Sequence, residues 1–169
     1  LLSMTAALSM MIAIAGGCSN GDSIRHLDLA ESCMNSDPEL ALRTIDSIDT
    51  RSLLSRSRKA RYALLKTMAL DKNFIDTADV NVILPAAEYY DRKGTATEKM
   101  RAYYYLGIVY SNAGDDSRAQ SCFILADDEI PETSDYYTAG LIKAMLADIF
   151  SREYNSSQEQ KYIEDALYY

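Results

Sequence analysis

Apolar residues recur along this chain at spacings of three and four positions, not at alternate positions. The pattern is clear at Leu27, Ala30 and Cys33, and again at Tyr62 and Leu65. This period places the apolar side chains on one face of a helix. Because no stretch of the sequence keeps a two-residue alternation, we predict an all-α protein.

Turn-forming residues divide the pattern into separate helices. Asp37 before Pro38 is typical of a helix start, and Gly94 after two basic residues is typical of a helix end. Pro131 ends another helix, whereas Pro85 indicates either a helix start or a kinked turn before it. The helices expected from these signals lie near residues 24–35, 38–49, 55–72, 80–93, 98–113, 116–129, 135–153 and 157–168.

One segment, residues 100–133, carries a series of aromatic and small residues at fixed offsets. The positions are Tyr103, Leu106, Gly107, Tyr110, Gly114, Asp115, Ala119, Phe123, Ala126 and Pro131. This series resembles the 34-residue tetratricopeptide repeat, with tyrosine in place of the family's first aromatic residue. The resemblance implies a right-handed α-solenoid of antiparallel helix pairs, with about four helical hairpins over residues 24–169.

The offsets of this repeat also have a physical basis. The small residues Gly107 and Ala119 let two antiparallel helices approach closely, and Tyr103, Tyr110 and Phe123 fill the space around that contact. We further expect Gly114 to supply a positive φ at the end of the first helix and Asp115 to cap the second.

The remaining repeats keep the spacing less well. Residues 27–48, 60–93 and 140–169 match in part, and the second of them carries an insertion near 72–79. The last predicted helix ends on apolar and tyrosine residues, Leu167 to Tyr169, without a polar outer face. Because a solenoid needs a solvated end unit, we expect this sequence to be a piece of a longer protein.

The first 17 residues are apolar and uncharged, and they end in small residues before Cys18. The segment resembles a bacterial lipoprotein signal peptide, although Ala15 stands where the family usually has leucine and a basic leader is missing. The resemblance implies a signal peptide at 1–17, a lipid on Cys18 and a polar tether at 18–23, similar to Bacteroidetes lipoproteins. It places the protein in the bacterial cell envelope, at the outer membrane or the periplasmic face. The alternative is a disordered or core-buried apolar N-terminus.

Charge and composition exclude several classes of function. The net charge is −8, from 17 basic and 25 acidic residues, so nucleic acid would be repelled by this portion of the protein. There is a single histidine, His26, and no nucleophile or phosphate-binding motif, and an acidic run at 127–129 lacks cation-loop spacing. We therefore expect that this protein is not an enzyme and binds no cofactor or metal.

Two further cysteines lie in the predicted helices. Cys33 and Cys122 either form a disulfide or remain separate buried thiols.

Tyrosine outnumbers phenylalanine 13 to 3, and every tyrosine lies at position 62 or later. In tetratricopeptide proteins the first helix of each pair lines a concave groove that holds a peptide. The resemblance implies that the groove is lined by Arg101, Tyr104, Tyr105, Ile108, Ser111 and Asn112, with Lys66, Thr67, Asp71, Asp148 and Arg152 from adjacent units. The alternative for Tyr104 and Tyr105 is burial of at least one of them against the next repeat.

The function expected from these features is a lipid-anchored scaffold that binds another protein or peptide and also contacts the membrane through Cys18. Two alternatives stay open. One is the extracytoplasmic sensor part of a longer signalling or transcription-regulating protein. The other is a helical-repeat lipoprotein that captures a glycan or a small ligand.

Overall fold

A computed structural model describes residues 19–152 and 156–169, and within these ranges the chain forms helices and no strands. All eight predicted helices are found there, with ends within a few residues of the expected positions except at the first helix. The α-helices are α1 (Ser19–Cys33), α2 (Pro38–Asp46), α3 (Arg56–Lys72), α4 (Leu84–Lys93), α5 (Ala96–Asn112), α6 (Asp116–Asp128), α7 (Tyr136–Arg152) and α8 (Ser156–Tyr168). Short 3-10 helices lie at η1 (Thr50–Ser52), η2 (Val80–Val82) and η3 (Ile130–Glu132).

Side-chain caps determine where several helices begin. Asp37 accepts a hydrogen bond from the Leu40 N–H at 2.9 Å, with Pro38 as the first residue of α2, as predicted. Before α5, Thr95 and Glu98 form a reciprocal capping box that satisfies two backbone N–H groups. Each of these caps joins residues that are three positions apart, so the helix starts could be predicted from the sequence.

Gly114 ends α5 with a φ of 76°, as the sequence predicted. Its N–H donates to the Ser111 carbonyl at 2.9 Å, and the next N–H, of Asp115, donates to the Tyr110 carbonyl at 2.9 Å. Asp115 then caps α6 by accepting from the Arg118 N–H at 3.0 Å. The turn between α5 and α6 is therefore short and fully hydrogen-bonded.

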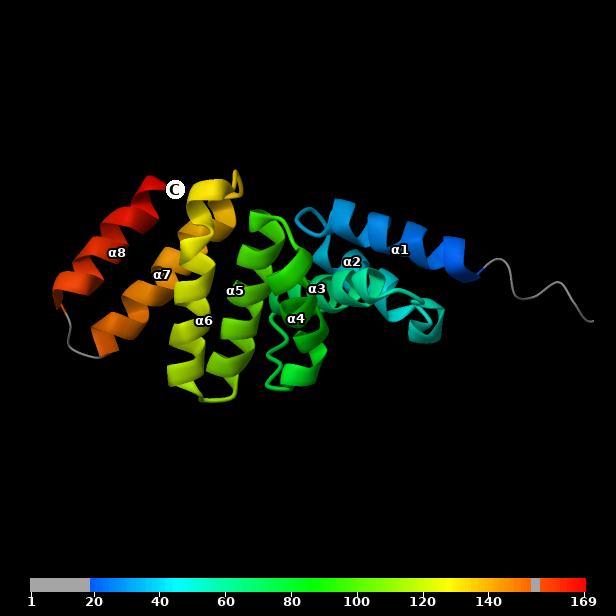
Figure 1. The fold of residues 1–169 in the computed structure, drawn as a ribbon, viewed down its shortest axis with the longest axis horizontal. Helices are drawn as coiled ribbons and strands as arrows, with labels where there is room; N and C mark the ends of the chain where they lie inside the picture. Colours follow the sequence, from blue (N-terminus) through cyan, green and yellow to red (C-terminus); the bar gives the residue numbers. More distant parts are fainter. Residues whose placement is uncertain (1–18, 153–155) are drawn as a thin grey trace, which may run out of the picture.

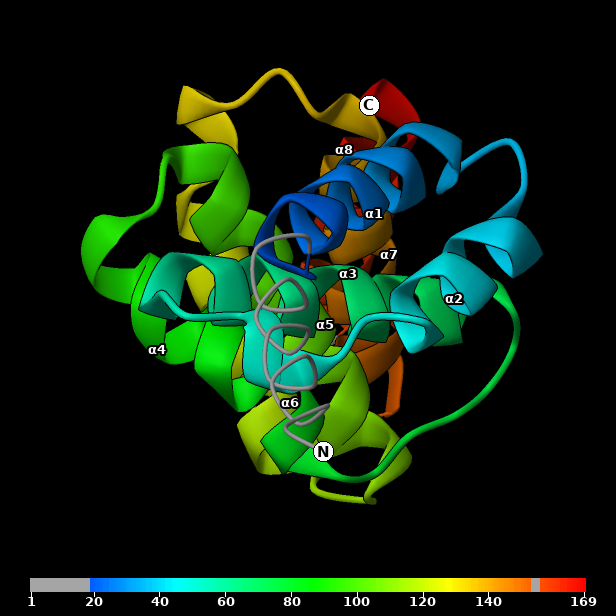
Figure 2. The ribbon, with the colours of Figure 1, turned by 90° about the vertical axis from the view of Figure 1, so that its right-hand side faces the viewer.

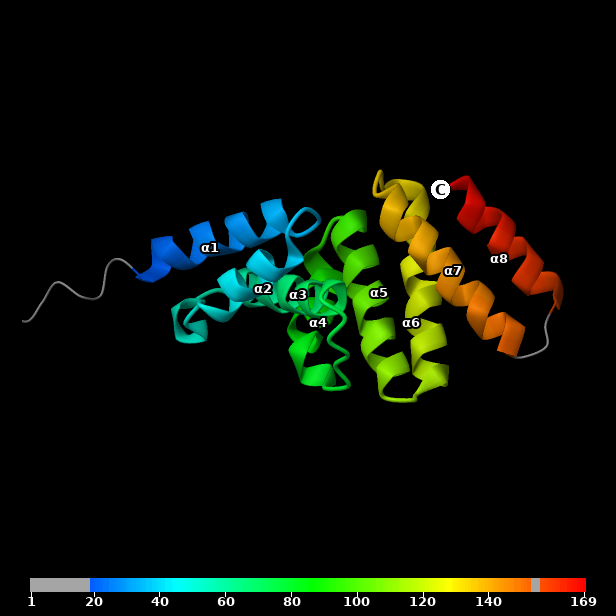
Figure 3. The same cartoon turned by 180° about the vertical axis from the view of Figure 1, so that it is seen from behind.

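Successive helices pack against one another along an elongated molecule, from α1 at one end to α8 at the other (Figure 1; Figure 3 shows the same order from behind). The odd-numbered helices α1, α3, α5 and α7 also contact each other in succession. The even-numbered helices of the described chain do not contact each other to a comparable extent. The odd-numbered row is therefore the more closely spaced of the two.

One continuous apolar core follows the molecule from α1 to α7. Its largest fully buried apolar side chains are Phe123, Leu27, Ile45, Leu53, Ile83, Met100, Ile142, Leu146 and Val109. Cys33 and Cys122 are both free and buried, so they do not form the disulfide that the sequence left open. Burial raises the pKa of the Cys122 thiol to about 11, which keeps it protonated at neutral pH.

The α3–α4 connection contains the predicted insertion. It runs along the outside of the helices when the molecule is viewed from the α1 end (Figure 2). The Asn73 side chain fixes its start by donating to the Pro38 and Ala69 carbonyls, at 2.8 and 2.6 Å. At its end, η2 precedes α4, where Pro85 lies in the first turn. Pro85 therefore lies at the start of a helix, and a turn precedes that helix, so both alternatives predicted for this proline are present.

The first helix differs from the expectation. It begins at Ser19 instead of near residue 24, so residues 19–23 of the expected polar tether are helical. Ser23 is buried, and its hydroxyl is hydrogen-bonded to that of Ser52. Contact with η1 therefore extends α1 toward the N-terminus. The segment predicted to be a signal peptide, residues 1–17, and Cys18 lie outside the described residues.

Candidate binding surface

Three of the predicted groove residues are buried, and the prediction that they line an open surface is wrong. Thr67 is 1% exposed, and its hydroxyl donates to the Ala63 carbonyl at 2.9 Å. Tyr104 and Tyr105 are 4% and 3% exposed, with their rings 4.9 Å apart and nearly perpendicular. Burial raises the pKa of both phenols. These two tyrosines are part of the core between α5 and its neighbours.

Other predicted groove residues are held by contacts within the fold. Arg101 binds Asp135, which precedes α7, with 2.6 Å between Nε and Oδ2. The Asn112 amide donates to the Thr77 carbonyl at 3.2 Å and ties the α3–α4 connection to the end of α5. Lys66 forms an ion pair with Asp46 of α2.

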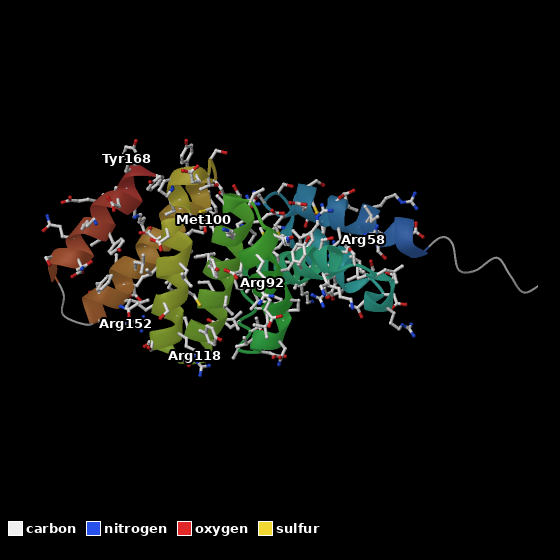
Figure 4. All side chains as sticks on the ribbon, viewed as in Figure 1. Arg58, Arg92, Met100, Arg118, Arg152 and Tyr168 are labelled. Atoms are coloured by element: carbon white, nitrogen blue, oxygen red, sulfur yellow. The ribbon has the colours of Figure 1, made fainter. Side chains whose placement is uncertain are left out.

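The predicted pair at the end of α7 is exposed. Arg152 binds Asp148 one turn earlier at 3.2 Å and Asp116 at the start of α6 at 3.1 Å. Figure 4 shows Arg152 and Arg118 along the same edge of the molecule. Ile108 and Ser111 are half-buried. The predicted groove residues therefore do not form one continuous open surface.

The structure adds a contact that the sequence did not indicate. The Lys72 ammonium, at the end of α3, lies 5.1 Å from the ring centroid of Tyr137 in the first turn of α7. Side chains of α3 and α7 therefore meet across α5, which lies between them in the row. Tyr137 is 65% exposed, so most of its ring remains accessible.

Asp71 lies directly before Lys72 and is half-buried. Among the described residues its carboxylate forms no ion pair and accepts no hydrogen bond. Burial raises its pKa, the charge of Lys72 opposes that shift, and Asp76 adds to it. The charge of Asp71 also contributes to the raised pKa of Tyr104 and Tyr105. We call Asp71, Lys72 and Tyr137, with Tyr104 and Tyr105 as the buried floor, the Asp71 surface.

Sequence reasoning named Asp71 but missed Lys72 and Tyr137. A partial signal was available, because two consecutive tyrosines, Tyr136 and Tyr137, stand at the start of a predicted helix. The contact between Lys72 and Tyr137 depends on how α3 and α7 are placed around α5. The relative placement of these helices could not be predicted from the sequence alone.

The residues predicted to pack the repeat hairpin are mostly in the core. Leu106, Gly107, Ala119, Phe123 and Ala126 are buried, and Pro131 is exposed within η3. The two other aromatic residues are half-buried. Tyr103 donates to Asp91 of α4, and the Arg118 guanidinium lies 5.4 Å from the Tyr110 ring centroid.

A separate cavity of about 330 Å³ lies between α1, α3, α4 and the start of α5. Its lining includes the cations Arg58, Arg61 and Lys93 and the ring of Tyr89. Arg61 already binds Asp28 and Glu31 of α1, the former at 2.7 Å. Because Arg61 is already paired with two carboxylates within the fold, this cavity is a weaker candidate for a ligand site.

The acidic run of α6 is largely neutralised by neighbouring basic residues. Asp127 binds Lys143 at 2.7 Å, and Glu129 binds Lys99 at 3.5 Å. His26 is half-buried, and its Nδ1 lies 3.2 Å from the Ser47 hydroxyl. The described side chains contain no group of three or more acidic, histidine or cysteine residues that could hold a metal ion.

No helix in the described part of the chain combines the length and apolar character needed to cross a membrane.

Comparisons with protein-family models, with curated proteins and with solved structures find no match for this chain. The fold therefore defines the class as an all-α protein of successively packed helices.

Proposed function

We propose that this protein is a tetratricopeptide-like scaffold that binds an extended segment of another protein on the Asp71 surface. The observation that supports this best is the contact between Lys72 and Tyr137 across α5. Because this contact joins side chains of two helices that flank a third, we infer that the face shared by α3, α5 and α7 is concave. A concave face bearing an accessible aromatic ring and charged groups fits peptide recognition.

The spacing of the helices supports a curved arrangement. The odd-numbered helices contact each other and the even-numbered ones do not to a similar extent, which favours an arrangement with the odd-numbered row on the inner side of a curve. This is the geometry expected of a right-handed solenoid of helix pairs, and it is the fold that we propose.

We also propose that the scaffold is held in the bacterial envelope by a lipid on Cys18. This part of the proposal rests on the small residues before Cys18 and the apolar segment that they end. Radioactive palmitate should label the protein when it is produced in a bacterium with lipoprotein processing, and Cys18→Ala should remove the label. Equal labelling of both forms would contradict it.

The polar groups of the Asp71 surface favour a peptide over a glycan. An aromatic platform without converging polar groups would favour a glycan, whereas here the ring centroid of Tyr137 lies 5.1 Å from the ammonium of Lys72, the residue after Asp71. Tyrosine is enriched among the residues that contribute most to binding at protein interfaces.

Selection from a displayed library of short random peptides tests the proposed site. We expect enriched peptides to lose most of their affinity for Tyr137→Ala and to keep it for the control Leu54→Ala. Leu54 is 74% exposed and lies before α3, near the other end of the molecule. Selection of no peptide, or equal binding to both variants, would overturn the proposal.

A further inference from the structure

The carboxylate of Asp71 is the least satisfied charged group on the proposed binding surface. It is half-buried, yet none of the described side chains donates a hydrogen bond to it or pairs with it. A carboxylate that has lost part of its water without gaining a partner is destabilised in its ionised form. The structure therefore maintains an acid in an unfavourable setting on a face that the fold leaves open.

The charged groups around Asp71 do not supply its missing partner. The nearest cation in the sequence, Lys72, turns its ammonium toward the ring of Tyr137 instead of the carboxylate. Arg101, which acts on the neighbouring Tyr105, is engaged by Asp135. Asp76 adds a second negative charge nearby. The two carboxylates Asp71 and Asp76 thus outnumber the one ammonium of Lys72, so this group of side chains is negative, in a chain whose net charge is −8.

We propose that Asp71 receives the side chain of a lysine or arginine of the bound peptide. This inference rests on the proposed function, because it identifies the chemistry of the segment held on the same surface. A cation would restore to Asp71 the interactions lost by burial, and charge-assisted hydrogen bonds to a carboxylate are among the strong polar contacts in proteins. The accessible ring of Tyr137 lies on the same surface, because Tyr137 and Asp71 both act on the pKa of Tyr104 and Tyr105, and it offers an aromatic face to the bound peptide.

The negative field also argues against the opposite ligand. An acidic segment would meet the carboxylates of Asp71 and Asp76, and the cation beside them, Lys72, already lies over the ring of Tyr137. A basic segment would instead be attracted over the longer range by the net charge of the chain. The proposed partner is therefore a basic, extended protein segment.

The test uses synthetic copies of peptides selected on the whole chain and compares them with Asp71→Asn. We expect a basic residue at one fixed position of the enriched peptides. Replacing this residue by norleucine, which has no charge, should weaken binding to the wild type by about tenfold or more, the range expected for loss of one partner of a half-buried charge pair. The same replacement should leave binding to Asp71→Asn nearly unchanged, so that the two changes are not additive.

A matched control is Asp128→Asn, which removes an exposed carboxylate from the end of α6. It should keep both the affinity and the sensitivity to norleucine. Asp71→Asn should remain folded, because burial already favours a neutral side chain at this position. Circular dichroism checks that point.

The outcomes separate this inference from the proposed function. Peptides that bind the wild type, lose affinity for Tyr137→Ala and show no basic preference would overturn the role of Asp71 alone. An acidic preference would overturn it as well. If no selected peptide depends on Tyr137, both the proposed site and the role of Asp71 fail.

Discussion

Gly107 provides the space that the ring of Phe123 occupies between α5 and α6. A Cβ at position 107 would lie 2.6 Å from the nearest atom of that ring, closer than real Cβ contacts allow. Ala119, which the sequence also indicated for close approach, is buried on α6. At this position the requirement for glycine comes from the aromatic ring.

We expect Gly107→Ala to lower the free energy of unfolding by about 1–3 kcal/mol, because a fully buried ring has little freedom to move aside. Urea denaturation measures the change. The control is Gly140→Ala, where the new Cβ would meet its nearest neighbour at 3.6 Å. It should be neutral or raise stability by about 0.5–1 kcal/mol through helix propensity. Equal effects at both positions would contradict the assigned packing.

Phe74 is held in a backbone conformation that disfavours it. Its φ is 57°, and its side chain is 95% exposed, so no packing within the fold offsets the strain. We expect Phe74→Asn to raise the free energy of unfolding by about 0.5–1 kcal/mol, since asparagine tolerates this conformation better. Leu54→Asn, at an exposed position without a positive φ, should leave stability nearly unchanged. Chemical denaturation of both variants would show the difference, and a loss of stability in Phe74→Asn would contradict it.

At the scale of whole elements, Asp135 joins the start of α7 to α5. It accepts from the Thr138 hydroxyl at 2.8 Å and from the Arg101 guanidinium at 2.6 Å. Burial alone would raise the pKa of this carboxyl, but the hydrogen bonds from Thr138 and Arg101 outweigh burial and lower it. The ionised form therefore stabilises the folded state.

We expect Asp135→Asn to lower stability at pH 7 by about 1–2 kcal/mol, because Arg101 loses a charged acceptor. A lowered pKa stabilises the fold at pH values above the ordinary value of 3.8 and ceases to do so as pH falls through the folded pKa. The difference from wild type should therefore disappear in acid below that value. Thermal unfolding across pH measures it, with the exposed Asp148→Asn as the control. A difference that persists in acid would exclude the ionic explanation.

Helix positions were predictable because their signals are local. Asp37, Asp115 and Gly114 act on backbone groups within a few residues, so the sequence alone places them well. Gly94 was located correctly for a different physical reason. Its φ is −79°, and glycine is required there because a Cβ would come within 2.8 Å of the Tyr90 carbonyl oxygen.

The binding surface was harder to predict because it depends on contacts between distant helices. The resemblance to the tetratricopeptide repeat predicted that Tyr104 and Tyr105 are exposed, but neighbouring helices cover both. Large tyrosine side chains gain more from burial of their rings than from exposure, provided that their neighbours leave room. Whether room exists is decided by α3 and α7, which lie more than 30 residues away on either side.

At the scale of the whole molecule, most contacts join helices that are neighbours in sequence, so stability should vary along the chain. The described side chains of α8 include no fully buried residue. This helix is held by the Tyr162 ring, stacked on Phe150 at 5.5 Å, and by Lys143 of α7. The Lys143 ammonium lies 2.7 Å from Asp127 of α6 and 3.4 Å from Asp165 of α8. One cation thus connects three helices.

We expect Lys143→Met to release α8 while leaving the other end of the molecule unaffected. Loss of the cation leaves two carboxylates without their partner, and a local loss of about 1.4 kcal/mol would speed amide exchange about tenfold. Hydrogen exchange read by mass spectrometry should show this increase in α8 and the adjoining part of α7, with α1 to α3 unchanged. Lys161→Met, which removes an exposed cation from α8 itself, should have little effect. A uniform increase from α1 to α8 would instead show that the helices unfold as a single cooperative unit, and that coupling extends well beyond neighbouring helices.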